Sequence, residues 1–169
     1  PAGPPATTRS YSNLSIGFLG AIVADQLGTT YAEAMDGGLF PALGLTGTFV
    51  RIPDERMADY AMGTNRDGRP TRMNPGFLVE EAYGIRSNIV DMTRFLAAAL
   101  GEADLDPGLA AALARRRTAY ADTKYYAQAM IWEGYAWPVA RATLEAGNSL
   151  DMALKPKRQT PRTPPAEPA

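Results

Sequence analysis

The sequence predicts a mainly helical chain with a few short β segments. Apolar residues recur at helical spacing in several stretches, which are bounded by capping residues or glycines. Strand composition, rich in β-branched and aromatic residues, is confined to short segments. The residues are 46% hydrophobic and 21% charged, which is ordinary for a globular domain that buries a core. These three observations favour one body of helices with short strands.

The first helix is expected to follow the stretch RSYSNLSIG, residues 9–17, and to end near Gly28. Tyr11 then lies at the helix N-terminus, where it could simply anchor the first turn. The helix is supported by apolar residues at mostly helical spacing: Leu14, Ile16, Phe18, Leu19, Ile22 and Val23.

A second helix is indicated by Thr30 and Glu33, which have the spacing of a capping box. It is expected to stop at Gly37 and Gly38, because paired glycines disfavour a helix. Residues 48–52, TFVRI, then have the composition of a strand.

Further strands are expected in two segments. Residues 60–73 predict a short hairpin with Asp67 and Gly68 at its turn, and an irregular stretch follows up to Gly84. Residues 125–138 are aromatic enough to form a strand, and Trp132 and Trp137 within them are expected in the core.

Two more helices complete the predicted body. The third begins at Ser87 and ends before Gly101, and its apolar face comprises Ile89, Met92, Phe95, Leu96 and Ala99. The fourth begins at Asp106 and Pro107, which are a favoured N-cap and first helical residue. Its C-terminal end carries a basic run, residues 115–117, where cations stabilise the helix dipole.

Both ends of the chain are rich in proline. Residues 1–6, PAGPPA, and 155–169, KPKRQTPRTPPAEPA, are expected to form extended chain rather than regular helix or inner strand. Linkers or frayed termini are the plain interpretation of such segments. The chain begins with Pro rather than Met and has no signal-peptide pattern, so we expect a piece of a longer protein.

The charge and the missing residue types exclude several functions. Seventeen basic and 18 acidic residues give a net charge of −1, so we expect neither nucleic acid nor an anionic membrane as a partner. The longest apolar run, Ile16 to Ala24, is too short to span a bilayer. The absence of cysteine excludes disulfides and thiolate chemistry, and the absence of histidine removes the commonest general base and metal ligand.

Covalent catalysis would therefore require a serine or threonine activated by lysine or tyrosine, or a pair of carboxylates. Glu80 and Glu81 are adjacent and are expected to point to different sides. Asp54, Glu55 and Asp59 have no recognisable ligand spacing, and carboxylates of this kind are mostly solvated surface groups. No glycine-rich phosphate-binding loop is present.

The stretch YSNLSIGFLGAI, residues 11–22, strongly resembles the tyrosine motif of class C (AmpC-type) serine β-lactamases. Further stretches resemble the same family in the same order, so the resemblance covers nearly the whole chain. They are PATTRSYSN (5–13), LFPALGLTGTFVRIP (39–53), NPGFLVEEAYGIRSNIVDM (74–92), QAMIWEGYAWP (128–138) and GNSLDMALKP (147–156).

The resemblance implies a role for each of several residues. Tyr11 would be the catalytic tyrosine that passes protons between the serine, the leaving nitrogen and water. Asn13 would bind the substrate's amide side chain and a motif lysine, although asparagine is also a favoured helix N-cap. Tyr83 would flank the substrate pocket, or alternatively pack under a loop. Glu133 matches a glutamate near the site, but Ala129 and Ile131 replace glycines common in that strand.

The family's Ser-x-x-Lys and Lys-Thr-Gly motifs do not occur in this sequence. The resemblance therefore implies a partial β-lactamase-like domain over residues 1–169, the helical domain and its junction within an α/β serine hydrolase. Residues 10–150 would form its mainly helical region. Residues 151–169 would be a proline-rich connection toward closing strands that the chain lacks. On its own this chain would be inactive.

The complete enzyme would hydrolyse β-lactams in the periplasm as a monomer, and the resemblance implies no metal or organic cofactor. An esterase or a D,D-peptidase of the same fold is the alternative enzyme, because both share the tyrosine motif. A non-enzymatic helical binding module is the alternative of another class, which the absent nucleophile and the proline-rich ends would favour.

Overall fold

The computed structural model describes residues 6–72 and 76–163, and the chain divides into two compact units. One unit combines residues 1–11 with residues 98–169, and the other comprises residues 12–97. Residues 73–75, between the predicted hairpin and the irregular stretch, therefore lie outside the described residues, as do the outermost parts of both proline-rich ends.

The helix predicted after Tyr11 is confirmed as α1, Asn13–Gln26. Its N-cap is Ser12, whose hydroxyl accepts a 3.2 Å hydrogen bond from the Ser15 backbone N–H. The capping role considered for Asn13 is therefore wrong, because the neighbouring serine already satisfies this backbone donor. The helix ends at Leu27, and Gly28 follows with a positive φ of +66°, as expected for a residue after a helix C-terminus.

The second predicted helix is longer than expected. The Thr30–Glu33 capping box opens α2, Tyr31–Glu33, as predicted. The helix then continues as a π-helical segment, Ala34–Leu39, into α3, Phe40–Ala42. The stop expected at the two glycines is wrong: glycine only weakly disfavours a helix, and Ala32 and Phe40, on either side of this segment, are buried.

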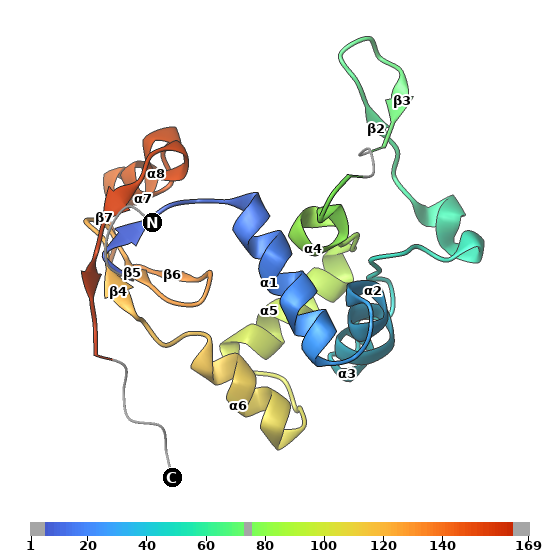
Figure 1. Cartoon of the computed structure of the whole chain (residues 1–169), viewed down its shortest axis with the longest axis horizontal. Coiled ribbons are helices and arrows are strands. Elements are labelled where there is room, and N and C mark those ends of the chain that lie inside the picture. Colours follow the sequence, from blue (N-terminus) through green and yellow to red (C-terminus); the bar gives the residue numbers. More distant parts are fainter. Residues whose placement is uncertain (1–5, 73–75, 164–169) are drawn as a thin grey trace. The chain divides into compact units, whose positions relative to one another are not determined.

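The strand expected at residues 48–52 is also wrong. Phe49 forms only an isolated bridge with Arg86, with backbone hydrogen bonds of 2.9 and 2.8 Å, and a 3₁₀ helix follows at Asp54–Asp59. The predicted hairpin is confirmed by antiparallel pairing of β2, Gly63–Thr64, with β3, Pro70–Thr71. Figure 1 shows this hairpin extending away from the helices of its unit.

Helix α4, Val79–Tyr83, occupies a stretch for which no regular structure was predicted. It packs on α1 at two glycines, because a Cβ on Gly17 would lie 2.7 Å from Leu78 Cβ and one on Gly20 would lie 2.8 Å from Glu81 Cβ. Figure 1 shows the two helices side by side. The predicted third helix is confirmed as α5, Ile89–Leu100.

In the other unit the predicted fourth helix is confirmed as α6, Pro107–Arg115. The Asp106 carboxylate caps it by accepting hydrogen bonds from the backbone N–H groups of Gly108 and Leu109. The two further helices of this unit are short: α7, Arg141–Gly147, and α8, Leu150–Leu154.

Short antiparallel strands complete this unit, in a four-stranded sheet with the order β6-β5-β4-β8. Its members are β4 (Ala121–Asp122), β5 (Ala127–Gln128), β6 (Glu133–Gly134) and β8 (Thr160–Pro161). The one strand expected at residues 125–138 is therefore a hairpin of β5 and β6. Pro161 lies in an edge strand, where its missing N–H is tolerated. A separate pair joins β1, Thr8–Arg9, to β7, Lys157–Arg158.

Each unit has a small core, and alanines predominate only among the buried apolar residues of the unit 1–11 and 98–169. Buried apolar residues of the unit 12–97 include Phe40, Leu43, Leu45 and Val50, and those of the other unit include Tyr126 and Met152. Trp132 is half-buried, whereas Trp137 is 89% exposed, so its expected core position is wrong. Within the described residues, no helix is long and apolar enough to cross a membrane.

Candidate functional site

Tyr11 lies between strand β1 and Ser12, the N-cap of α1, and its side chain is 62% exposed. Asn13 is the first residue of α1, and it is exposed as well. The Ser12 hydroxyl, not the amide of Asn13, accepts the hydrogen bond from the Ser15 N–H at this end of the helix. Two polar side chains thus stand free for chemistry on either side of a helix N-cap.

Tyr83 is the last residue of α4 and is 47% exposed. The contact between α1 and α4 pairs Gly17 with Leu78 and Gly20 with Glu81, so both helices advance in the same direction. Asn13 therefore lies before this contact and Tyr83 after it, on two neighbouring helices of the unit 12–97.

Arg9, which the sequence analysis did not single out, is held from three directions within its unit. Its Nε donates to Gln128 Oε1 at 3.0 Å, and its Nη1 donates to the Met152 carbonyl at 3.0 Å. Its Nη2 forms an ion pair with Glu133 Oε1 at 3.2 Å. The guanidinium carbon also lies 5.9 Å from the centre of the Tyr126 ring.

Glu133 thus has an identified partner: it pairs with an arginine that lies two residues before Tyr11. Burial, followed by the effect of the Glu133 carboxylate, raises the pKa of Tyr126 to about 12. Tyr126 therefore stays neutral at ordinary pH, and the charges of this cluster are those of Arg9 and Glu133. The only sequence signal for Arg9 was its position beside the tyrosine motif, since its partners lie 119 to 143 residues away.

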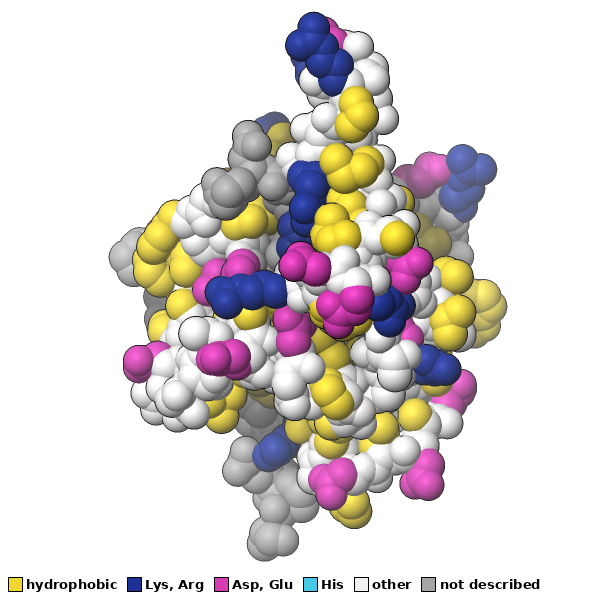
Figure 2. Space-filling model, turned by 90° about the vertical axis from the view of Figure 1, so that its right-hand side faces the viewer, with side chains coloured by type: hydrophobic (Ala, Val, Ile, Leu, Met, Phe, Trp, Pro, Cys, Tyr) yellow, Lys and Arg dark blue, Asp and Glu magenta, His cyan; other side chains and the backbone are white. Residues whose placement is uncertain are grey.

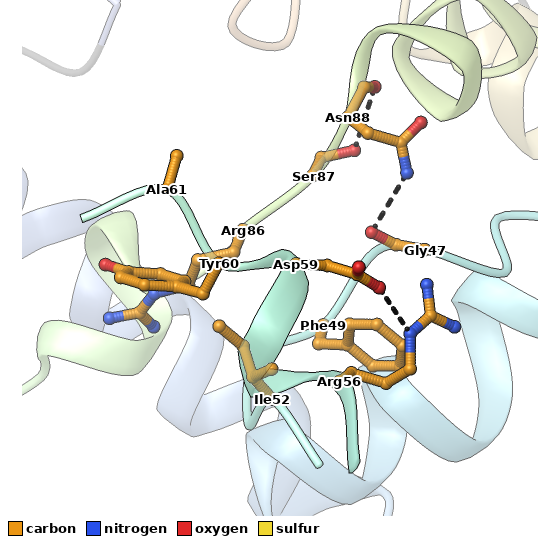
Figure 3. A pocket seen from close by; sticks show the side chains of 10 residues that line it. All are labelled: Gly47, Phe49, Ile52, Arg56, Asp59, Tyr60, Ala61, Arg86, Ser87 and Asn88. Atoms are coloured by element: carbon orange, nitrogen blue, oxygen red, sulfur yellow. Dashed lines mark hydrogen bonds and ion pairs between the residues drawn. The ribbon is translucent and has the colours of Figure 1, made fainter. Parts of the chain in front are cut away.

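A cavity of about 470 Å³ lies in the unit 12–97, lined by residues from two segments, 47–61 and 86–88. Figure 3 shows that polar side chains around it are engaged with the protein. Arg56 Nε donates to Asp59 Oδ2 at 3.1 Å, and Asn88 Nδ2 donates to the Gly47 carbonyl at 3.2 Å. Tyr11, Asn13 and Tyr83 do not line this cavity, so we do not assign the predicted chemistry to it.

The face drawn in Figure 2 carries side chains of both charges. Figure 2 shows basic side chains at the tip of the hairpin, and acidic and basic side chains interspersed below it. Among the described residues, no group of three or more histidine, cysteine, aspartate or glutamate side chains could hold a metal ion.

The sequence profile of the family described as Beta-lactamase matches residues 1–158. The chain belongs to the β-lactamase family. A β-lactamase of Psychrobacter immobilis is 41% identical over 157 residues, which are 93% of this chain and 39% of that protein.

Solved structures narrow the resemblance within the β-lactamase family. A class C β-lactamase from Rhodobacter sphaeroides is 42% identical, with a TM-score of 0.89 over 95% of this chain and 46% of that one. A protein described as the D-alanine carboxypeptidase AmpC from Burkholderia cenocepacia is 41% identical, with a TM-score of 0.90 over 96% of this chain and 46% of that one. The predicted class C resemblance and the predicted helical portion of its fold are confirmed.

This β-lactamase-family chain spans less than half the length of the relatives it matches, between 39% and 46% for these three. The remaining residues of each relative therefore have no counterpart in the sequence of this chain.

Proposed function

We propose that this chain supplies Tyr11 and Asn13 to the active site of a class C serine β-lactamase, whose nucleophilic serine lies in a segment outside the chain. In the proposed reaction the serine oxygen attacks the lactam carbonyl and the amide C–N bond breaks. The ring nitrogen takes a proton, and water then hydrolyses the acyl-serine ester. The observation that carries the proposal is the exposed Tyr11 in a family motif, directly before the N-cap of α1.

Each residue has a separate task in this proposal. Tyr11 relays the proton between serine, leaving nitrogen and water, because the sequence contains no histidine to do so. Asn13 binds the amide side chain of the substrate and the lysine of the serine motif. Tyr83 flanks the pocket for the acyl side chain of the substrate. We also propose that the enzyme acts in the periplasm, which cell fractionation of the producing organism would test.

The test uses the product of the complete reading frame that encodes this chain, assayed with a chromogenic cephalosporin. Tyr11→Phe is expected to lower kcat about a hundredfold while unfolding at nearly the same temperature, because only the transferable proton is removed. Tyr60→Phe is the matched control, since it removes a phenol of the other unit that the proposal leaves without a role. Turnover by Tyr11→Phe close to that of the unmodified enzyme would contradict the proposal.

A second candidate is a D-alanine carboxypeptidase of the same fold, which the description of the Burkholderia cenocepacia relative favours. The same serine, lysine and tyrosine chemistry would then cleave a peptide amide. Release of D-alanine from a peptide ending in D-alanyl-D-alanine would be compared with cephalosporin hydrolysis on the same preparation. The larger kcat/KM identifies the substrate class for which the site is built.

A further inference from the structure

We propose that Arg9 is a positioning residue for Tyr11, and that Glu133 is the partner that keeps its guanidinium in place. The inference rests on the proposed proton-transfer role of Tyr11. It concerns the unit formed by residues 1–11 and 98–169, which contains Arg9, Tyr11 and all the groups that hold Arg9.

The first support is the number of separate segments that Arg9 engages. Its three nitrogen atoms donate to β5, to the backbone of α8 and to β6, so one planar guanidinium ties three elements to β1. Arginine suits this task because its five donors are fixed in one plane, and little freedom remains to be lost when each bond forms. The side chains of Arg9 and Glu133 are only 20% and 24% exposed, so the ion pair is partly shielded from solvent.

The second support is how short the link to Tyr11 is. Two residues of chain span at most about 7 Å, so a fixed Arg9 leaves the Tyr11 backbone little room to move. The backbone of β1 is itself held, because Arg9 pairs with Lys157 in β7. The exposed ring of Tyr11 thus has few direct restraints of its own, and the anchored Arg9 two residues before it limits where it can reach.

Two other ion pairs of the same unit lack this arrangement. Arg162 forms hydrogen bonds of 2.7 and 2.6 Å with both carboxylate oxygens of Asp122, but both side chains are nearly half exposed, and β4, which contains Asp122, already pairs with β8 just before Arg162. Arg141 bonds to Glu145 one helical turn away, and its side chain is 91% exposed. Of these three ion pairs, only the Arg9–Glu133 pair joins distant segments next to a proposed catalytic residue.

The experiment is a double-mutant cycle in the product of the complete reading frame, with kcat and KM measured for a chromogenic cephalosporin. Arg9→Gln is expected to lower kcat about tenfold or more and to change KM less than about twofold, because misplacement of a proton-transfer group affects the transition state. In the Tyr11→Phe background the same substitution is expected to change kcat less than about twofold. The kcat of Arg9→Lys should lie between those of the unmodified enzyme and Arg9→Gln, since lysine keeps the charge and loses the planar donors.

Arg162→Gln is the matched control and should leave kcat unchanged in both backgrounds. An equal loss on Arg9→Gln with and without Tyr11 would overturn the positioning role while leaving the proposed function standing. A harmless Tyr11→Phe would overturn the proposed function, and the positioning role with it. If Arg9→Gln does not fold, Glu133→Gln provides the same comparison, because it leaves two of the three Arg9 hydrogen bonds in place.

Discussion

At the scale of single residues, the most buried charge in the described part of the chain is the carboxylate of Asp91, which is 2% exposed. Its Oδ2 accepts hydrogen bonds from the Gly47 N–H at 2.7 Å and the Thr48 hydroxyl at 2.8 Å. Its Oδ1 accepts one from Arg94 at 3.1 Å. A buried carboxylate with this set of donors fastens α5 to the segment at residues 47–48.

Replacement of this carboxylate should weaken the unit 12–97. We expect Asp91→Asn to lower the free energy of unfolding by about 2–3 kcal/mol, because hydrogen bonds to a charged acceptor are each worth about 1.5–3 kcal/mol. Urea unfolding followed by circular dichroism measures the change. Asp25→Asn, at an exposed position in α1, is the control and should shift the midpoint little.

The same carboxylate makes stability depend on pH. Burial favours its neutral form, but the hydrogen bonds from Thr48, Gly47 and Arg94 outweigh burial and lower its pKa. Because its pKa is lowered, the carboxylate stabilises the folded unit at pH values above the ordinary aspartate pKa, about 3.9. This stabilisation is lost as the pH falls below that value. The Asp91→Asn chain should accordingly lose less stability than the unmodified chain below about pH 4. An equal loss in both chains would contradict this assignment.

Ile131 is the clearest case of local strain. It has a φ of +69° in the loop between β5 and β6, where the Ala129 N–H donates a 2.8 Å hydrogen bond to the Trp132 carbonyl. A φ in this left-handed region favours glycine or asparagine, and a β-branched residue there is an outlier. The backbone thus keeps a glycine-like conformation at a position where the resemblance predicts glycine.

Ile131→Gly should therefore stabilise the chain by about 1 kcal/mol. The left-handed conformation costs a non-glycine residue about 1–2 kcal/mol, and the greater freedom of unfolded glycine offsets about 0.5–1 kcal/mol of that gain. The side chain is 74% exposed, so its removal forfeits little packing. Ile89→Gly, at an exposed position in helix α5, should destabilise instead. A lower unfolding midpoint for Ile131→Gly would count against strain at this turn.

At the scale of elements, the predictions that succeeded depend on local signals. Helices α1, α5 and α6 and the β2–β3 hairpin were predictable, since caps, apolar spacing and turn residues are all within a few positions of one another. The strand predicted at residues 48–52 does not form, because within the described residues Phe49 pairs only with Arg86. Pairing is decided by a distant segment, which composition does not reveal.

The same division applies to the candidate site. Tyr11 and Asn13 could be singled out because their motif is contiguous. Arg9 could not, since Gln128, Glu133 and Met152 are brought to it only by the pairing of β1 with β7 and by the β5–β6 hairpin. Helix α4 was missed for a related reason: its short apolar stretch does not predict a helix by itself, and packing on the glycines of α1 supports it.

The contact of α1 with α4 leads to a prediction about those glycines. Alanine favours a helix over glycine by about 1 kcal/mol, but a Cβ on Gly17 would lie 2.7 Å from Leu78 Cβ. We expect Gly17→Ala to be destabilising by about 1–2 kcal/mol, since overpacking of this kind costs about 1–3 kcal/mol. Gly38→Ala is the matched control, because no heavy atom lies within 4 Å of its added Cβ, and it should be neutral or stabilising. Thermal unfolding of both variants compares them, and a stabilised Gly17→Ala would exclude close packing at this contact.

At the scale of the whole molecule, α1 is apolar on every side, a pattern typical of a helix that is buried all round. Here its large apolar side chains Leu14, Ile16, Phe18, Leu19, Ile22 and Val23 are between 38% and 59% exposed. The apolar face expected of α5 is similarly uncovered at Ile89, Met92 and Leu96, which are 80%, 48% and 48% exposed. Exposed apolar surface of this extent is uncommon on a protein that remains monomeric.

The 169-residue chain alone should therefore associate, as light scattering coupled to size-exclusion chromatography would measure. Leu19→Glu together with Ile22→Glu should reduce association, because both side chains are more than half exposed on α1. Leu150→Glu is the control, since it places the same charge at an exposed position, 77% exposed, outside α1. A monomeric unmodified chain would contradict this expectation.

The isolated chain should also lack β-lactamase activity. A covalent β-lactamase requires nucleophile, base and oxyanion donors within reach of one carbonyl, and this sequence contains neither Ser-x-x-Lys nor Lys-Thr-Gly. Tyr11 of the isolated chain would thus have no motif lysine or nucleophile to act on. We expect the chain to hydrolyse a chromogenic cephalosporin no faster than buffer and to form no penicillin adduct in intact-mass spectra. A stable adduct mapped to Ser12 or Ser15 would overturn the proposal that the nucleophile lies outside this chain.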